Sequence, residues 1–229
     1  MAKSSFLGLC QATRRECRIT GTGPAAVTNQ SGLLLKIVNW VADSAYETES
    51  RWHDWDFMWY DGWSSATIAN TKAVAAPSDL GVWDEDSFWL NYTLSTNKKL
   101  SVLDYKEWRR DLRNGIRASK KPDSVVILPD QSLILEPPPD GIYSLTADYW
   151  KRPTKMSANT DVSMIPQDYE RIIIARAKMF YGEIEGAGVI LESAQIEYDD
   201  LLDKLESKYL PGQKGRRRAE APMMVVQPE

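Results

Sequence analysis

Residues 31–53 have the sequence SGLLLKIVNWVADSAYETESRWH, and the spacing of their apolar side chains decides the class of fold that we expect. Apolar residues recur at every third or fourth position, which is the period of a helix with one buried face. Polar residues at 28–31 precede the run and can cap its first turn. The stretch therefore predicts an amphipathic helix of about five to six turns. Its expected buried residues are Leu34, Ile37, Val38, Val41, Ala45 and Trp52.

Further helices are expected toward both ends of the chain. Ser4 or Ser5 can cap a first helix that runs to about Arg18, before the Gly-Thr-Gly-Pro of residues 21–24. Pro166 opens a third long helix, and the Gly-Ala-Gly of residues 186–188 separates it from a fourth. The third helix is expected to bury Tyr169, Ile173, Ala177, Phe180 and Ile184, and the fourth Leu191, Ala194, Tyr198, Leu201, Leu202, Leu205 and Tyr209.

The middle of the chain has the composition of strands. Residues 87–94, 124–128, 132–137 and 142–150 are rich in β-branched and aromatic side chains. Turns containing Pro and Asp separate the last three, which predicts two consecutive hairpins. Apolar and polar residues alternate along 142–150, as in a sheet with one covered face. A short strand after residue 100 leads into a short helix that Asp104 can cap.

Together these elements predict an α+β fold, mainly a helical bundle with a small antiparallel β-sheet inserted between the second and third long helices. We expect the bundle from residues 1–53 and 165–210, and the inserted β-rich region with its short helix from residues 54–164. An extended C-terminal arm is expected from residues 211–229, because no apolar periodicity remains after the helix that ends near Tyr209.

The composition excludes several classes of protein. The chain has 229 residues and a formal net charge of −4, which argues against a general nucleic-acid binder. No apolar run is long enough for a transmembrane helix, and the apolar stretch near the N-terminus is too short for a signal peptide, so we expect a cytoplasmic location. Cys10 and Cys17 lie seven residues apart on an expected helix, a rise of ~10 Å that is too long for a disulfide. Both are expected to be reduced.

No motif of an enzyme or a cofactor site is present in the sequence. A nucleophile elbow, a P-loop, a zinc-protease helix and a CxxC pair are all missing. His53 is the single histidine, and its favoured role is that of a helix-end residue near the C-terminal dipole. The acidic stretch at residues 83–89 lacks the spacing of a calcium loop. We therefore expect no catalytic activity, no cofactor and no metal.

Five of the nine tryptophans lie close together in the sequence. Two interpretations stay open: a core that joins the bundle to the sheet, or a platform on which sugars stack. The core is favoured, because Trp52, Trp55, Trp59 and Trp63 recur every three to four residues at an expected junction between a helix and a strand. The five are Trp40, Trp52, Trp55, Trp59 and Trp63.

The last residues, YLPGQKGRRRAEAPMMVVQPE (209–229), combine charge with an apolar tip. Disordered tails are normally polar, so apolar residues at a tip favour docking into the groove or onto the sheet edge of another protein. The candidate docking residues are Arg216, Arg217, Arg218, Met223, Met224, Val225 and Val226.

Two expected helices carry opposite charges. Residues 183–209 hold eight acidic and two basic side chains, whereas the first helix is basic. The charges are explained either by solvation or by contact between neighbouring copies of the chain. The candidate inter-subunit residues are Arg14, Arg15 and Arg18 on one side and Glu192, Glu197, Asp199 and Asp200 on the other.

Several stretches resemble the head-to-tail adaptor, or connector, proteins of tailed bacteriophages, especially the short-tailed ones. The resemblance begins in residues 9–52, where Arg-Arg-Glu-Cys leads through a Gly-x-Gly-Pro loop into a Val-Asn-Trp-Val helix. It covers about residues 5–210 and continues through DWDFM (54–58), L-x-x-x-x-Y-x-E-W-R-R (100–110), YWKRP (149–153) and Ile-Pro-x-x-Tyr (165–169).

This resemblance implies a structural protein of the virion, assembled in the host cytoplasm. Such adaptors form a ring, usually of twelve copies, between the portal and the tail or nozzle, and they extend the DNA channel. They often grip the portal through a C-terminal arm. The implied partners are the portal protein, a tail or nozzle protein, copies of the chain itself and, through non-specific contact, genomic DNA, with no membrane. The alternatives are a tail-tube or nozzle component and an aromatic-surface carbohydrate-binding module.

Overall fold

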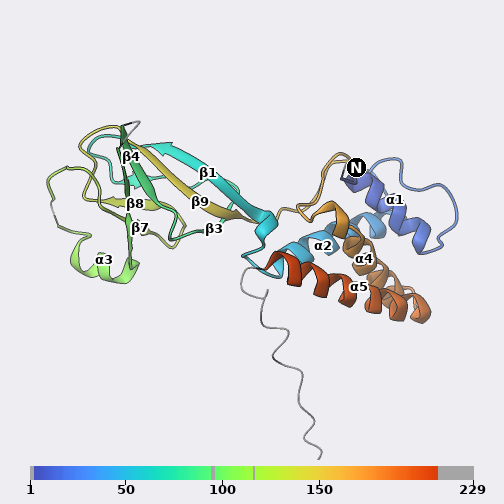
Figure 1. Ribbon diagram of the computed structural model, residues 1–229. Coiled ribbons are helices and arrows are strands. Elements are labelled where there is room, and N and C mark those ends of the chain that lie inside the picture. Colours follow the sequence, from blue (N-terminus) through green and yellow to red (C-terminus); the bar gives the residue numbers. More distant parts are fainter. Residues whose placement is uncertain (1–2, 94–95, 116, 211–229) are drawn as a thin grey trace, which may run out of the picture. The chain divides into compact units, whose positions relative to one another are not determined.

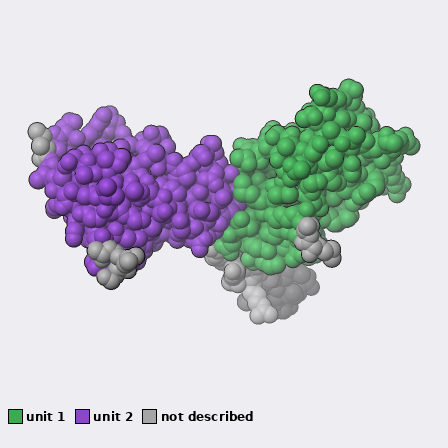
Figure 2. Space-filling model, turned by 90° about the horizontal axis from the view of Figure 1, so that it is seen from above, with its two compact units in different colours: residues 1–57, 153–229 green, residues 58–152 purple. Residues whose placement is uncertain are grey.

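The computed structural model describes residues 3–93, 96–115 and 117–210, and the chain divides into two compact units (Figures 1 and 2). The helical unit comprises residues 1–57 and 153–229, and the sheet unit comprises residues 58–152. The sheet unit is thus inserted into the helical unit, with boundaries at 58 and 152 where the sequence suggested 54 and 164.

Residues 153–164 belong to the helical unit because polar contacts tie them to its helices. Lys3 Nζ donates to the Ser163 carbonyl oxygen at 2.8 Å, and the Ser163 hydroxyl donates to Glu49 Oε1 at 2.6 Å. The Phe6 amide donates to the Asp161 carbonyl oxygen at 2.7 Å. These contacts join the segment to both N-terminal helices. The sequence of the segment did not reveal this, because its apolar residues show no regular spacing.

The helical unit contains the four long helices that the sequence predicts (Figure 1). They are α1 (Phe6–Glu16), α2 (Gly32–Ser50), α4 (Arg171–Ile184) and α5 (Gly188–Tyr209), with the 3₁₀ turn η2 (Gln167–Tyr169) before α4. Ser5 is the N-cap of α1, and its hydroxyl accepts from the Gly8 amide. The break at residues 186–188 is confirmed, and Gly186 adopts the left-handed conformation there, with φ of 71°.

Helix α4 is the centre of the unit and contacts α1, α2 and α5. A methyl group added at Gly182 would lie 2.7 Å from Leu191 Cβ and 2.9 Å from its Cα, so only glycine allows α4 and α5 to approach so closely. Because other helices surround α4, it is buried on more than the one side that the sequence predicts. Its buried residues include Ile172, Ile173, Ile174, Ala175 and Ala177. The expectation that Ile184 is buried is wrong, since 56% of it is exposed at the helix end.

In the residues of the sheet unit that the structure describes, there are nine strands and one short helix (Figure 1). The strands are β1 (Trp59–Ala66), β2 (Ala73–Val74), β3 (Leu80–Trp83), β4 (Trp89–Thr93), β5 (Thr96–Lys99), β6 (Ser101–Leu103), β7 (Ser124–Ile127), β8 (Leu133–Glu136) and β9 (Ser144–Lys151). The 3₁₀ turn η1 (Asp56–Met58) precedes β1, and α3 (Tyr105–Asp111) follows β6. As expected, Asp104 caps α3, accepting from the amides of Lys106 and Glu107 at 2.8 and 3.0 Å.

The strands form two sheets that share one core, not the single small sheet that the sequence suggested. Sheet A has the order β1-β9-β4-β5, with β3 also paired to β9, and sheet B has the order β2-β8-β7-β6. All pairs in sheet A are antiparallel, whereas β6 and β7 in sheet B are parallel. Side chains from both sheets fill the core between them, including Trp83, Phe88, Leu90, Val125, Leu133, Leu135, Leu145 and Tyr149.

The predicted β7–β8 hairpin is confirmed, but the second hairpin is wrong. Strand β9 pairs with β1, β3 and β4 in sheet A and not with β8. Residues 137–139 are consecutive prolines, which supply no backbone N–H for a ladder, so the chain leaves sheet B at this point. The alternation along β9 is as expected, since Leu145, Ala147 and Tyr149 are buried.

The tryptophans do not form one core, so the expectation of a single aromatic cluster is wrong in part. Trp55 is fully buried in the helical unit and stacks on Phe57, with ring centroids 5.1 Å apart. Trp63 is half-buried and packs on the core of the sheet unit. Trp52 and Trp59, however, are 39% and 38% exposed. The helical period did not predict this, because α2 ends at Ser50, before Trp52, and Trp59 begins a strand.

Candidate assembly surfaces

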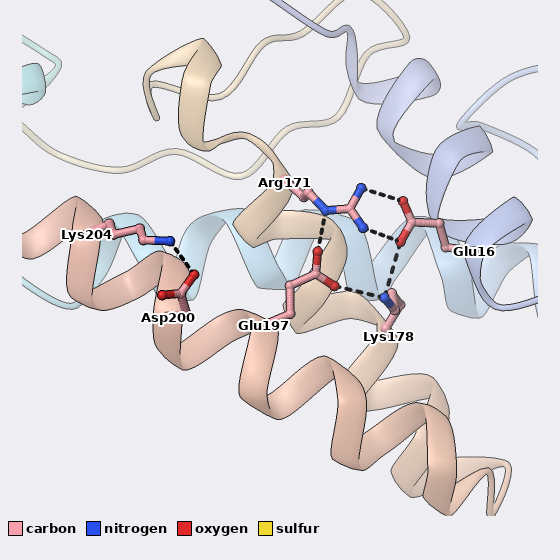
Figure 3. A network of polar contacts seen from close by, with 6 residues as sticks. All are labelled: Glu16, Arg171, Lys178, Glu197, Asp200 and Lys204. Carbon is pink, nitrogen blue, oxygen red and sulfur yellow. Dashed lines mark hydrogen bonds and ion pairs between the residues drawn. The ribbon is translucent and has the colours of Figure 1, made fainter.

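Four charged side chains from three helices meet in the helical unit (Figure 3). Arg171 NH1 and NH2 donate to the two carboxylate oxygens of Glu16 at 3.1 and 3.3 Å. Lys178 Nζ lies 3.2 Å from Glu16 Oε2 and 3.0 Å from Glu197 Oε2. Arg171 Nε also donates to Glu197 Oε1. This group, which we call the charge cluster, joins α1, α4 and α5.

The charge cluster shifts the pKa values of Arg171, Lys178 and Glu197 in the direction that favours their ionised forms. Burial by itself lowers the pKa of Lys178, but hydrogen bonds from its ammonium to Glu197 and Glu16 outweigh burial and raise it. Burial likewise opposes ionisation of Glu197, and the bonds from Lys178 and Arg171 bring its pKa below the usual value. The Lys178 side chain is only 11% exposed, whereas Arg171 is 54% exposed, so the cluster is shielded from solvent around Lys178 and open at Arg171. Its role is to lock the helices together.

Glu197, one of the candidate inter-subunit residues, is therefore engaged within its own chain. Asp200 is exposed and pairs with Lys204 one turn further along α5, with Nζ and Oδ2 2.6 Å apart (Figure 3). Glu192 and Asp199 are exposed on the same helix. The four acidic candidates thus have two different environments, a difference that their spacing in the sequence did not reveal.

The basic candidates lie at the C-terminal end of α1. Arg15 and Arg18 are exposed, whereas Arg14 is half-buried, with an Nε atom that finds no hydrogen-bond partner among the described residues. Arg18 has a φ of 56°, a left-handed conformation that follows the last turn of the helix. Two of the three arginines therefore present their charge to solvent.

An apolar component accompanies the acidic side chains of α5. Val189 is 85% exposed and Ile196 is 68% exposed. Together with Glu192, Asp199 and Asp203 they follow one another at spacings of three and four residues, so they share one side of the helix. We call these five residues the outer face of α5. The sequence analysis did not identify its two apolar members, Val189 and Ile196. They lie seven residues apart, as Glu192 and Asp199 do, and this common spacing indicates that all four share one side of the helix.

Sheet A presents a second apolar surface, which we call the outer face of sheet A. Cross-strand pairing places Trp59 and Val82 beside Trp150, and Trp89 beside Thr146, on the side opposite the buried residues of β9. Trp59, Val82 and Trp89 are 38%, 37% and 39% exposed. The Trp59 and Trp150 rings meet edge-on, with centroids 4.6 Å apart and planes at 82°.

Other candidates lie outside the described residues or find no site within them. Arg216, Arg217, Arg218, Met223, Met224, Val225 and Val226 all lie outside the described part of the chain. Within residues 3–93, 96–115 and 117–210, no group of His, Cys, Asp and Glu side chains could hold a metal ion. His53 is exposed after the end of α2. No helix in the described residues is long and apolar enough to cross a membrane.

Comparison with known proteins identifies the family. The model of the SU10 adaptor protein family matches residues 4–226, which include all described residues of both compact units except Lys3. No curated protein matches the chain. The match confirms the resemblance to bacteriophage adaptor proteins that residues 9–52 and the later segments suggested. The chain therefore belongs to the SU10 adaptor protein family, a family of structural phage proteins.

Proposed function

We propose that this chain is a head-to-tail adaptor, which forms a ring between the portal and the tail or nozzle and extends the DNA channel in the virion. The observation that carries the proposal is the family match, because it spans residues 4–226 and thus both units. A ring needs two different surfaces on each copy, one that meets the preceding copy and one that meets the next. The helical unit offers such a pair.

The outer face of α5 and the basic end of α1 are the surfaces that we assign to neighbouring copies. Arg15 and Arg18 of one copy complement Glu192 and Asp199 of the next. Exposed ion pairs contribute only ~0–1 kcal/mol each, and their main effect is to orient the two surfaces. Burial of Val189 and Ile196 adds ~1.5–3 kcal/mol for each side chain that is fully covered.

Such a contact is weak for a single pair of copies, because association itself costs at least ~4 kcal/mol. The free protein is therefore expected to be mostly monomeric, and closure of the ring needs the portal as a template. In this assembly the C-terminal arm holds the portal, and many arms on one ring bind with high avidity although each binds weakly. Contact with genomic DNA in the channel is expected to be non-specific and weak, because a chain with a net charge of −4 gains little from the phosphate backbone.

A charge exchange on capsids that carry a portal tests this proposal. Arg15→Glu and Asp199→Lys should each lower the number of adaptor copies per portal, seen by electron cryomicroscopy, because each places like charges together. The double variant should recover occupancy. Asp61→Lys, an exposed acidic residue of the sheet unit, is the matched control and should assemble normally.

The proposal is overturned if the wild-type protein does not occupy the portal vertex. Location of the ring at the far end of the tail would instead support the alternative function, a tail-tube or nozzle component. Normal occupancy by both single variants would overturn the assigned contact but not the adaptor function.

One observation favours the carbohydrate-binding alternative: Trp59 and Trp89 are exposed on the outer face of sheet A. The Trp59 and Trp150 rings meet edge-on, at 82°, so this pair is not the coplanar platform that a sugar chain would need. Trp89→Ala separates the two functions, because it should abolish retention on immobilised glycans only if this face binds sugar. For an adaptor, neither the wild type nor this variant should be retained.

A further inference from the structure

Helix α3 of the sheet unit carries basic side chains along its exposed side. Four basic residues occur between positions 106 and 113, and all four are exposed: Lys106, Arg109, Arg110 and Arg113. Their spacing of i, i+3, i+4 and i+7 places them on one side of a helix. Arg113 follows the last turn, and its amide still donates to the Trp108 carbonyl oxygen at 3.0 Å. We call these four residues the basic stripe.

A buried contact fixes the orientation of α3. Trp108 is the buried residue of the helix, and its Nε1 donates to Glu136 Oε1 at 2.9 Å. Glu136 on β8 is only 1% exposed and also accepts from Lys72 Nζ at 2.8 Å. Because a buried indole N–H needs a partner, this bond keeps Trp108 turned toward sheet B. The basic stripe, on a different side of the helix, is therefore turned toward solvent at the surface of the sheet unit (Figure 1).

Most of the charge of the basic stripe is available to a ligand. Arg110 pairs with Asp111, and the Nε and Oδ1 atoms are 2.7 Å apart. The other three members form no ion pair with any described residue: Lys106, Arg109 and Arg113. The helix dipole explains basic side chains in the last turn of α3, but it disfavours Lys106 in the first turn. Stabilisation of the helix by itself therefore does not account for the stripe, whereas a negatively charged ligand does.

The surroundings of the basic stripe favour phosphate groups over another protein as the ligand. The core of a protein–protein interface is apolar, but no large apolar side chain is exposed among the described residues from 104 to 121. Protein–DNA interfaces are more polar and more positive, and the planar guanidinium of arginine binds phosphate through two parallel hydrogen bonds. From Lys106 to Arg113 the stripe rises ~10 Å, which corresponds to about three successive phosphates of one DNA strand.

We propose that the basic stripe is a binding site for the phosphate backbone of double-stranded DNA. Lys106, Arg109 and Arg113 each contact a phosphate, and Arg110 contributes less because Asp111 partly neutralises it. Phosphate contacts carry no sequence information, so the binding is non-specific. The net charge of −4 is an average over both units, and the stripe is a local exception to it. Repulsion from the remaining acidic residues keeps the affinity weak, with a Kd of ~10⁻⁴–10⁻⁶ M at physiological salt.

The basic stripe gives the contact with DNA a defined place on the chain. In an assembled adaptor the DNA is the phage genome, and a weak contact that reads no sequence allows the duplex to slide past it. This identification of the DNA rests on the proposed function, whereas the affinity of the stripe for duplex DNA does not.

Titration of the full-length chain against a fluorescently labelled DNA duplex of mixed sequence tests the site. Fluorescence anisotropy gives the Kd at several salt concentrations between about 0.05 and 0.2 M, the range in which phosphate contacts change affinity most clearly. The variants are Arg109→Gln, Arg113→Gln and the double variant. Lys98→Gln is the matched control, because Lys98 is an exposed basic residue on β5 of the same unit and does not belong to the stripe. All three positions are exposed, so the variants should keep the circular dichroism of the wild type.

The wild type should show a plot of log K against log salt concentration with a slope of about −2.7 to −3.6, which is −0.9 for each of three to four phosphates. Arg109→Gln and Arg113→Gln should each make this slope shallower by about 0.9, which corresponds to an about eightfold higher Kd at 0.1 M salt. The double variant should lose about 1.8 of the slope. Lys98→Gln should change the Kd by less than about twofold, and a second duplex of unrelated sequence should bind equally well.

Absence of wild-type binding at about 0.05 M salt, or an equal loss for Lys98→Gln and Arg109→Gln, would overturn the proposal. Retention of the wild type but not of Arg109→Gln on immobilised poly-glutamate, without binding to the duplex, would also overturn it and would assign the stripe to an acidic protein partner. The titration contains no capsids. Normal portal occupancy without DNA affinity would therefore remove this inference alone, and DNA affinity without portal occupancy would remove the adaptor function alone.

Discussion

The ion pair between Lys178 and Glu197 is expected to stabilise the helical unit more than an ordinary surface pair does. Its Nζ and Oε2 atoms are 3.0 Å apart, and the two side chains are only 11% and 23% exposed. Exposed pairs contribute ~0.2–1 kcal/mol, whereas hydrogen bonds to charged groups reach ~1.5–3 kcal/mol when they are shielded. Since Glu197 keeps some access to water, we expect a coupling energy of about 1–2 kcal/mol.

A double-mutant cycle measures this energy without the cost of leaving one charge unpaired. Lys178→Met retains the aliphatic chain and Glu197→Gln retains the shape of the carboxylate, so neither change opens a large cavity. Both single variants and the double variant are unfolded with urea while the helical circular dichroism is followed. The coupling energy is the difference between the change in unfolding free energy of the double variant and the sum of the changes of the two single variants.

The pair Lys204–Asp200 on the same helix provides the matched control (Figure 3). Its atoms are 2.6 Å apart, but the two side chains are 60% and 58% exposed. A pair of this kind at a spacing of four residues contributes ~0.3–0.5 kcal/mol. If the Lys178–Glu197 coupling does not exceed that of the control, shielding does not strengthen the charge cluster and the reasoning is refuted.

The pH dependence of the coupling has a defined sign. The pKa of Glu197 is lowered in the folded state, so folding releases a proton in the window between the folded and unfolded values. The stabilisation is fully present above the unfolded pKa, which is ~4.3 for glutamate, and it is lost as the pH falls through the folded value. The cycle repeated in strong acid should therefore give no coupling.

Three further predictions concern other parts of the chain. Trp55→Ala should lower the free energy of unfolding in urea by ~3–5 kcal/mol, because Trp55 is fully buried. Trp59→Ala should lower it by less than about 2 kcal/mol, because Trp59 is 38% exposed. Equal losses for the two variants would contradict this prediction. Burial raises the pKa of Glu49 in the folded protein. The contribution of this residue to the free energy of unfolding therefore falls as the pH rises from ~4.3, the pKa of an unfolded glutamate, through its pKa in the folded protein. Glu49→Gln should flatten this pH dependence when the free energy of unfolding is measured at several pH values. Truncation after Gly212 should leave the thermal midpoint unchanged yet abolish retention on portal-bearing capsids, and normal decoration would exclude the arm as the grip.

The helices could be located from the sequence because the interactions that define them are local. The i, i+3 and i, i+4 spacing of apolar residues marked α2. The start of α1 was marked by two possible caps, Ser4 and Ser5, of which the structure uses Ser5, and the start of α3 by Asp104. The glycines at 186 and 188 marked the break before α5. Each signal depends on neighbours within about one turn of the helix, so no tertiary information was needed.

Strand pairing was predicted only where the partners are adjacent in the chain. The β7–β8 hairpin has a short turn and was found, whereas the residues of β9 pair with residues of β1 that lie 78 to 91 positions earlier. Alternation along β9 identified its buried face, but alternation is the same whichever strand lies beside it. The choice of partner, and hence the division into two sheets, depends on the shared core that Trp83, Leu90 and Leu145 help to fill.

The candidate surfaces divide in the same way. The family resemblance, the charges of the two helices and the chemistry of the arm could be read from the sequence, since these are properties of residue types in order. The pairing of Glu197 within its own chain could not, because it depends on three packed helices: Arg171 binds both Glu197 and Glu16, and Arg171 and Glu16 are 155 residues apart in sequence. The hollow between β3 and β6 was likewise visible only in the structure, because a hollow between two sheets exists only when segments distant in sequence are packed together.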